Sequence, residues 1–232
     1  SGKRIVRRYS LPSGAGTYCS LLKKICARHN VQEAIVCSVV PKATALLAKE
    51  LQLILGCKPI IIGRDCKVPI KNRYRKPALV GQDRLVNAFA GVKLYGQPLI
   101  VIDCGTAVTF DILSAQGAYE GGVILPGLQL SLDALFERTA LLPSVSVSKP
   151  RELIGRDTKS SMLSGAVFGF ASLIDHMVIR LNKEIGVRAR VILTGGNADL
   201  MGEYCKRIDV KDSDLTLKGI QLMYSQFKSK VS

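Results

Sequence analysis

The sequence contains no tryptophan, two histidines and only 6% aromatic residues. No apolar run reaches the roughly 18 residues that a membrane-spanning helix needs, and the opening SGKRIVRRYS is not a secretory signal peptide. The seven cysteines are odd in number and form no CxxC pair. These absences argue against a membrane protein, a disulfide framework and a cysteine-rich zinc site, and they predict reduced thiols in a cytoplasmic protein.

Acidic residues are scarce in the first part of the chain. Residues 1–100 hold 18 Lys and Arg against four Asp and Glu, a formal net charge of +14, whereas the remaining residues carry +1. Such an excess is typical of proteins that bind nucleic acid, membrane surfaces or anionic small molecules, and equally of a solvated basic face that aids solubility. Neither a recognition motif nor interleaved aromatic residues accompany it, so we do not expect nucleic-acid binding.

The first part of the chain predicts alternating strands and helices. Short apolar runs predict strands at Ile5–Ser10, Glu33–Val40 and Pro59–Ile62, and helical spacing predicts helices over Tyr18–His29 and Lys42–Leu55. This β-α-β-α-β order implies a sheet with crossover helices.

The pattern changes after a basic loop, Lys67–Lys76, and a helix predicted over Val80–Leu94. The elements predicted beyond it are three consecutive strands (Leu99–Asp103, Ala107–Leu113, Tyr119–Leu125), two helices (Leu128–Leu141, Ser161–Glu184), a strand (Arg190–Thr194) and two short helices (Asp199–Lys206, Asp214–Phe227). Three strands followed by alternating elements are typical of a ribonuclease-H-like layer. The predicted fold class is therefore α/β, with two such halves of actin/hexokinase type, residues 1–97 and 98–232, facing each other across a nucleotide cleft.

The stretch DCGTAVTFD, Asp103 to Asp111, ends one apolar strand and begins another. Gly105 lets the backbone approach phosphate oxygens, and successive N–H groups in a turn form an anion-binding nest. Thr106 and Thr109 add hydroxyl donors, and Asp103 supplies a hard oxygen for a cation. The same residues also suit a structural hairpin with an Asx-type cap.

The stretch VGQDRLVNAFAG places Gly81 at a helix start and Asp83 and Arg84 in its first turn. The positive end of a helix favours a carboxylate there. A carboxylate beside an arginine can accept a hydroxyl proton while the guanidinium holds an anionic group, which suits phosphoryl transfer to an alcohol. A helix-capping Asp with a surface Arg is the structural alternative.

Three weaker signals follow. GGVILPGLQLSLDALFERTALLP, from Gly121 to Pro143, has glycine turns before a helix, where an anion can bind or the helix can simply pack on the sheet. GRDTKSSMLSG places Thr158 just before a helix, where an N-cap residue would lie. LTGGNADL puts Gly195 and Gly196 in a strand-to-helix turn that could face an adenosine.

Taken in order, these stretches resemble the type III pantothenate kinases from about Lys3 to Phe227. The resemblance is carried by YRKPALVGQDRLVNAFAG, VIDCGTAVTFD, GGVILPGLQLSLDALFERTALLP, GRDTKSSMLSGAVFGFASLIDHMV, VILTGGNADL and DLTLKGIQLMY. It implies ATP-dependent phosphorylation of pantothenate to 4'-phosphopantothenate, the entry step to coenzyme A. It also implies a homodimer with the substrate pocket at its interface.

The resemblance assigns roles position by position. Asp83 matches the catalytic base, and Asp103 matches the ligand of an activating monovalent cation, K+ or NH4+. Positions that match substrate contacts are Tyr74, Gly81, Gln82, Asp83, Arg84 and Thr158. Thr106 matches an ATP contact, and we assign Gly105, Gly195 and Gly196 to the nucleotide with it, together with the Mg2+ that accompanies ATP.

One expected motif is missing from the sequence. Family members open with a strand and a DxGNT-type phosphate loop upstream of the segment that matches Lys3–Ser10, and that loop helps to hold ATP phosphates and magnesium. Its absence implies either a chain that lacks residues of its parent protein or a non-catalytic relative that binds a ligand or acts as a regulatory accessory protein. A third possibility is sugar or acetate kinase activity. The sequences around GQDR and Thr158 argue against it, because they resemble the type III pantothenate kinases specifically.

Overall fold

The computed structural model describes residues 5–9 and 18–231. The chain forms two compact units that alternate along the sequence. Unit 1 comprises Ser1–Pro69, Ala78–Ala90 and Thr216–Ser232, and unit 2 comprises Ile70–Pro77 and Gly91–Leu215. The predicted halves follow the chain in order, whereas unit 1 also takes in the C-terminal helix.

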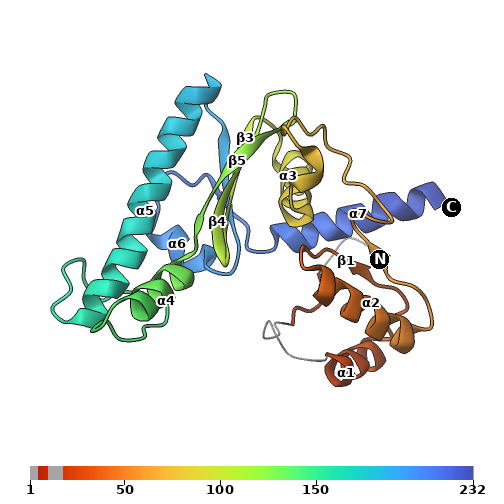
Figure 1. Ribbon diagram of the computed structural model, residues 1–232. Helices are drawn as coiled ribbons and strands as arrows, with labels where there is room; N and C mark the ends of the chain where they lie inside the picture. The colour runs from red at the N-terminus through yellow and green to blue at the C-terminus, as the bar shows by residue number, and fades with distance from the viewer. Residues whose placement is uncertain (1–4, 10–17, 232) are drawn as a thin grey trace. The chain divides into compact units, whose positions relative to one another are not determined.

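A five-stranded sheet forms the centre of unit 2 (Figure 1). In spatial order its strands are β5 (Tyr119–Pro126), β4 (Ala107–Leu113), β3 (Leu99–Cys104), β6 (Arg190–Thr194) and β7 (Val210–Lys211). The first three form an antiparallel meander, and β6 and β7 run parallel to β3. This arrangement is that of a ribonuclease-H-like layer, which confirms the predicted α/β class and the layer predicted for the second half of the chain. Strand β7 was not predicted, because two residues are too few to give a pattern in the sequence.

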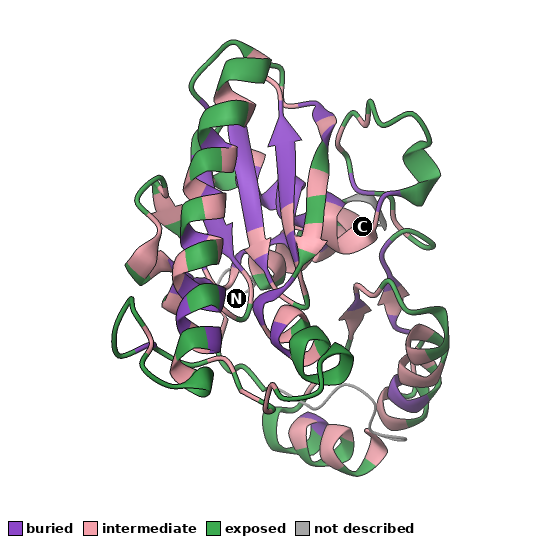
Figure 2. Ribbon diagram, turned by 60° about the vertical axis from the view of Figure 1, so that its left-hand side comes forward, coloured by how far each residue is buried: buried purple, intermediate pink, exposed green. Residues whose placement is uncertain are grey.

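The core of unit 2 lies between one face of this sheet and its helices. Helices packed with the sheet are α4 (Leu128–Arg138), α5 (Thr158–Ile185) and α6 (Ala198–Tyr204). Alternation along the strands sends Ile100, Ile102 and Phe110 to the same face, where they join Val167 and Ile174 of α5 in one buried cluster. Figure 2 shows these central strands in the buried colour.

Helix α5 begins at Thr158, earlier than predicted, because Asp157 caps it. Asp157 Oδ1 accepts the Ser160 N–H at 2.9 Å, and the Ser160 side chain bonds back to the cap in a capping box. The expectation that Thr158 precedes the helix is therefore wrong. Contrary to the expectation from the sequence, α5 is long and apolar enough to cross a membrane, by length and composition only; its Val167 and Ile174 are buried in the core.

Unit 1 has a smaller sheet and a separate core. Its elements are α1 (Cys19–His29), β1 (Ile35–Val36), α2 (Pro41–Leu55), β2 (Ile60–Ile61), the first residues of α3 (Gln82–Tyr95) and most of α7 (Leu215–Val231); the 3-10 turn η1 (Pro77–Leu79) precedes α3. The two strands are parallel, and Val36, Leu51 and Ile61 form the buried cluster between strands and α2. The helices lie at their predicted positions.

The strand predicted over Ile5–Ser10 is wrong for the part that the structure describes. Residues 5–9 are not in a strand, and the Val6 side chain is 84% exposed. No described strand lies in register with them, and the charged side chains of Arg7 and Arg8 favour solvent on both sides. Ser10 lies outside the described residues.

Candidate active site

The stretch DCGT forms the turn between β3 and β4, as predicted. The Gly105 N–H donates to the carbonyl of Ala107 at 3.0 Å, and the carbonyl of Thr106 accepts the Gly127 N–H at 2.9 Å. Gly127 directly precedes α4, so the positive end of the α4 dipole lies beside the turn. A Cβ at Gly127 would overlap the carbonyl oxygens of Gly105 and Thr106. The turn and the helix start therefore pack backbone against backbone.

The turn after β6 reaches the same edge of the sheet because β6 runs parallel to β3. The Asn197 N–H donates to the carbonyl of Cys104 at 3.0 Å. Gly195 has a φ of +97°, and a Cβ there would lie 2.7 Å from Cys104 N and closer still to Asp103 Oδ1. The structure thus brings Asp103, Gly105, Thr106 and Gly195 together at the carboxyl ends of β3 and β6, and the exposed Gly196 follows in the same turn.

Two threonines flank Asp103 on the neighbouring strands. Asp103 is opposite Thr109 on β4 and opposite Thr194 on β6. Residues directly opposite each other share a face of the sheet, with Cβ atoms about 5 Å apart. The Oγ1 atoms of Thr109 and Thr194 are both buried, and neither has a hydrogen-bond partner within residues 5–9 and 18–231. A carboxylate between two such hydroxyls is an all-oxygen donor set that fits a hard cation.

Thiols do not contribute to this site. All seven cysteines are free, as predicted. Burial, followed by Cys205 and the Asp103 carboxylate, raises the pKa of Cys104 to about 12, so its thiol stays protonated near neutral pH. In the part of the chain that the structure describes, no group of three or more His, Cys, Asp or Glu side chains could hold a metal ion. A cation at Asp103 would therefore depend on hydroxyl and backbone oxygens.

The stretch GQDR forms the start of α3 in unit 1, as predicted. The carbonyl of Gly81 accepts the Leu85 N–H at 3.2 Å. Asp83 Oδ1 accepts the N–H of Arg84 at 2.8 Å, which holds the carboxylate at the positive end of the helix. Both Asp83 and Arg84 are partly exposed. The Nη2 atom of Arg84 is nevertheless buried.

The first turn of α3 lies at the carboxyl ends of β1 and β2. A Cβ at Gly63, just beyond β2, would lie 2.8 Å from Gln82. Cys37 directly follows β1, and its pKa is raised to about 12 by burial and by the nearby Asp83 carboxylate. Ligands of parallel sheets bind at this edge. The placement of Asp83 therefore agrees with a chemical role.

Two predicted substrate contacts, Tyr74 and Thr158, belong to unit 2. The Tyr74 ring lies 6.4 Å from the Tyr119 ring, between centroids, and remains 36% exposed. Thr158 is exposed at the first position of α5. None of the described contacts of either residue reaches the turn between β3 and β4.

Sequence reasoning missed Thr194 as a candidate site residue. The sequence does contain a signal for this residue, because Thr194 ends the strand RVILT and precedes two glycines. What the sequence did not show is that this strand pairs with β3 in a register that places Thr194 opposite Asp103.

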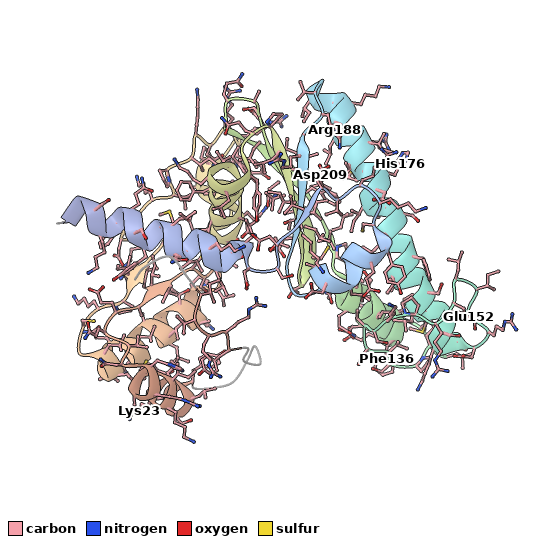
Figure 3. The ribbon with its side chains drawn as sticks, turned by 180° about the vertical axis from the view of Figure 1, so that it is seen from behind. Lys23, Phe136, Glu152, His176, Arg188 and Asp209 are labelled. Atoms are coloured by element: carbon pink, nitrogen blue, oxygen red, sulfur yellow. The ribbon has the colours of Figure 1, made fainter. Side chains whose placement is uncertain are left out.

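A cavity of about 690 Å3 lies at the opposite ends of the same strands. Its lining includes Tyr95, Arg188, Arg190 and Asp209. Arg188 Nη2 donates to Asp209 Oδ1 at 3.1 Å, and Figure 3 labels both residues. The cavity contains none of the predicted site residues, and it lies at the amino ends of β3 and β6, away from the edge where parallel sheets bind ligands.

Comparison with known proteins agrees with this arrangement. The family model of the type III pantothenate kinases matches residues 3–180. The chain belongs to this family. A type III pantothenate kinase of Persephonella marina (strain DSM 14350 / EX-H1) is 44% identical over 198 residues, which cover 85% of this chain and 78% of the relative. The type III pantothenate kinase of Sulfurihydrogenibium sp. (strain YO3AOP1) is 39% identical over 194 residues, 84% of this chain and 77% of the relative.

A solved structure supports the fold. A conserved Campylobacter jejuni protein assigned to the Baf family of transcriptional activators superposes with a TM-score of 0.55 and 18% identity, covering 89% of this chain and 88% of that one. At this identity the likeness concerns the fold alone. The family membership supports the predicted kinase, and nothing in the comparisons supports the alternative of a non-catalytic relative.

Proposed function

We propose that this chain transfers the terminal phosphoryl group of ATP to pantothenate, giving 4'-phosphopantothenate and ADP in the first step of coenzyme A biosynthesis. The observation that carries this proposal is family membership, with 44% identity to a type III pantothenate kinase over 85% of the chain. A kinase of this family uses ATP together with a divalent cation, which neutralises charge on the phosphates.

Asp83 is the general base of the proposed reaction. It accepts the proton of the pantothenate primary hydroxyl as that oxygen bonds to the γ-phosphorus, while the bond from the γ-phosphorus to the β–γ bridging oxygen breaks and ADP leaves. Arg84, with Gly81 and Gln82, binds the anionic substrate. The carboxylate held at the start of α3 by the Arg84 N–H supports this role.

The turn residues of unit 2 bind the nucleotide and a cation. Gly105 and Thr106 contact the phosphates beside the positive end of α4, and Gly195 and Gly196 contact the rest of the nucleotide. Asp103, flanked by the two buried threonine hydroxyls, would hold the monovalent cation, K+ or NH4+. Such an ion, when bound, supplies positive charge near the transferred group.

The chain works as a homodimer in the cytoplasm under this proposal. Apolar side chains remain exposed on and after α4, at Leu135, Phe136, Leu141, Leu153 and Ile154. Phe136, labelled in Figure 3, is 49% exposed. Exposed apolar groups of this kind commonly mark a surface that another protein covers. Thr158 follows this segment, and Thr158 and Tyr74 are the remaining proposed contacts with pantothenate.

The test is an ADP-release assay with pantothenate, Mg-ATP and either K+ or Na+. Asp83→Asn should lower turnover about 100-fold or more, because it removes the base. Asp133→Asn, the same change on α4, should leave turnover within about twofold. Equal turnover in the wild type and the Asp83 variant would overturn the role of Asp83. A chimera that carries the additional segments of the Persephonella marina relative should be assayed beside the chain. If neither protein shows pantothenate-dependent turnover, the proposed function is wrong.

A further inference from the structure

Two ionisable side chains in the sheet of unit 2 are buried and have no role in the proposed transfer. Asp111 on β4 and Tyr119 at the start of β5 are both 0% exposed. Tyr119 Oη donates to Asp111 Oδ1 at 2.8 Å. A buried carboxylate is unfavourable without partners, and apolar side chains of similar volume often pack at least as stably. Stability alone therefore does not explain why this polar pair is buried here.

Tyr119 is also the residue that holds a basic segment of unit 2 against the outer edge of the sheet. Its N–H donates to the carbonyl of Lys71 at 2.8 Å, and its carbonyl accepts the N–H of Arg73 at 2.8 Å. Together these bonds form a parallel bridge between Asn72 and Tyr119. Arg73 then pairs with Glu120 at 2.9 Å. One residue of β5 thus fixes the backbone of this segment.

Tyr74 follows Arg73 in this segment, and both its backbone and its ring contact neighbouring residues. Its N–H donates to Asn72 Oδ1 at 2.9 Å. Its ring is tilted by 53° against the Tyr119 ring and lies over the backbone of Gly121, where a Cβ would be 3.7 Å from the ring. Because the hydroxyl of Tyr119 is bound to Asp111, the surface on which the Tyr74 ring rests is fixed. The outer part of that ring remains open to a ligand.

We infer that Asp111 and Tyr119 are positioning residues that fix Tyr74 for pantothenate, so that they set the affinity for pantothenate and leave the rate of phosphoryl transfer unchanged. The inference rests on the proposed function, in which Tyr74 contacts this substrate. A ring that is already ordered loses less conformational freedom when a ligand binds. Residues that hold the ring in place therefore increase the affinity without contacting the reacting atoms.

The first test separates KM from kcat. Tyr119→Phe should raise KM for pantothenate about tenfold and change kcat and KM for ATP less than about twofold, the signature of lost uniform binding. Asp111→Asn keeps a carbonyl oxygen that can accept a hydrogen bond from the Tyr119 hydroxyl. KM of this variant for pantothenate should therefore stay within about threefold of the wild type. Unchanged KM in the Tyr119 variant would overturn the inference.

A matched control removes a similar hydroxyl elsewhere in unit 2. Tyr95 Oη donates to Asp212 Oδ2 at 2.6 Å, and Asp212 is buried. Tyr95→Phe and Tyr119→Phe should both lower the melting temperature, but Tyr95→Phe should not raise KM for pantothenate. An equal rise in KM in both variants would show a general structural effect and would overturn the inference.

A double variant separates stability from positioning. Asp111→Leu with Tyr119→Phe replaces the buried polar pair by apolar side chains, so the melting temperature should recover. KM for pantothenate should remain raised, because the Tyr119 ring is no longer bound through its hydroxyl. Recovery of KM together with the melting temperature would overturn the positioning role.

A spectroscopic test does not depend on turnover. The chain has no tryptophan, so Tyr74→Trp introduces a single tryptophan whose fluorescence can be excited apart from that of the tyrosines. Acrylamide should quench it more strongly when Tyr119→Phe is added, because the ring loses its fixed support. Equal quenching would overturn the positioning role. If the wild type shows no pantothenate-dependent turnover while quenching changes as expected, the proposed function fails and the positioning of Tyr74 stands.

Discussion

Alanine at Gly195 places a methyl group where the backbone of β3 already lies. The new Cβ would be 2.7 Å from Cys104 N and 2.8 Å from Cys104 C, and the φ of +97° is strained for any residue with a Cβ. Strained backbone of this kind destabilises the folded state by about 1–3 kcal/mol, and overpacking destabilises it by a similar amount. We expect the free energy of unfolding to fall by about 4 kcal/mol, which lowers the melting temperature by roughly 8–16 °C.

The neighbouring glycine gives a matched control. A Cβ at Gly196 has no heavy atom within 4 Å, so Gly196→Ala should change the free energy of unfolding by less than about 0.5 kcal/mol. Calorimetry of both variants measures the difference. Titration with Mg-ATP should also show weaker binding to the Gly195 variant, because the overlap displaces the turn at Asp103. Equal melting temperatures and equal ATP affinities would refute the close approach of the two turns.

Three further predictions concern the cation, the oligomer and pH. Thr194→Val removes a buried hydroxyl, so the melting temperature should hold while the K+ concentration for half-maximal activation rises about tenfold; unchanged K+ dependence contradicts the cation site. Phe136→Asp should yield monomers in light scattering, and a persistent dimer would exclude this surface. Burial raises the pKa values of Cys37, Cys104 and Cys205 to about 12 from 9.0, so the folded state retains protons that the unfolded state loses. Melting temperatures should therefore fall from pH 9 toward 12, and a triple serine variant should fall less.

Several elements followed from local pattern. Alternating apolar residues in Ala107–Leu113 and a short break at Gly105 predicted a hairpin, and β3 and β4 form it. Helical spacing after Gly81 predicted the start of α3, which begins at Gln82. Such signals succeed because residues close in the chain determine them.

The errors came where a partner distant in the chain decides the outcome. Apolar residues at Ile5 and Val6 suggested a strand, but no described strand pairs with them. Strand β7 forms only because Val210 lies beside Ile192 of β6. Local composition does not record which of these partners is present.

The sequence by itself determined the family, the order of the main elements and the residues with chemical potential, because ordered motifs and apolar spacing are properties of the chain. The tertiary structure decided which of those residues meet. Parallel pairing of β6 with β3 sets Thr194 beside Asp103 across some 90 residues, and the edge of β5 brings Tyr119 under Tyr74. Strand register is fixed wherever a face of the sheet is buried, so these neighbours depend on the packing of the whole unit.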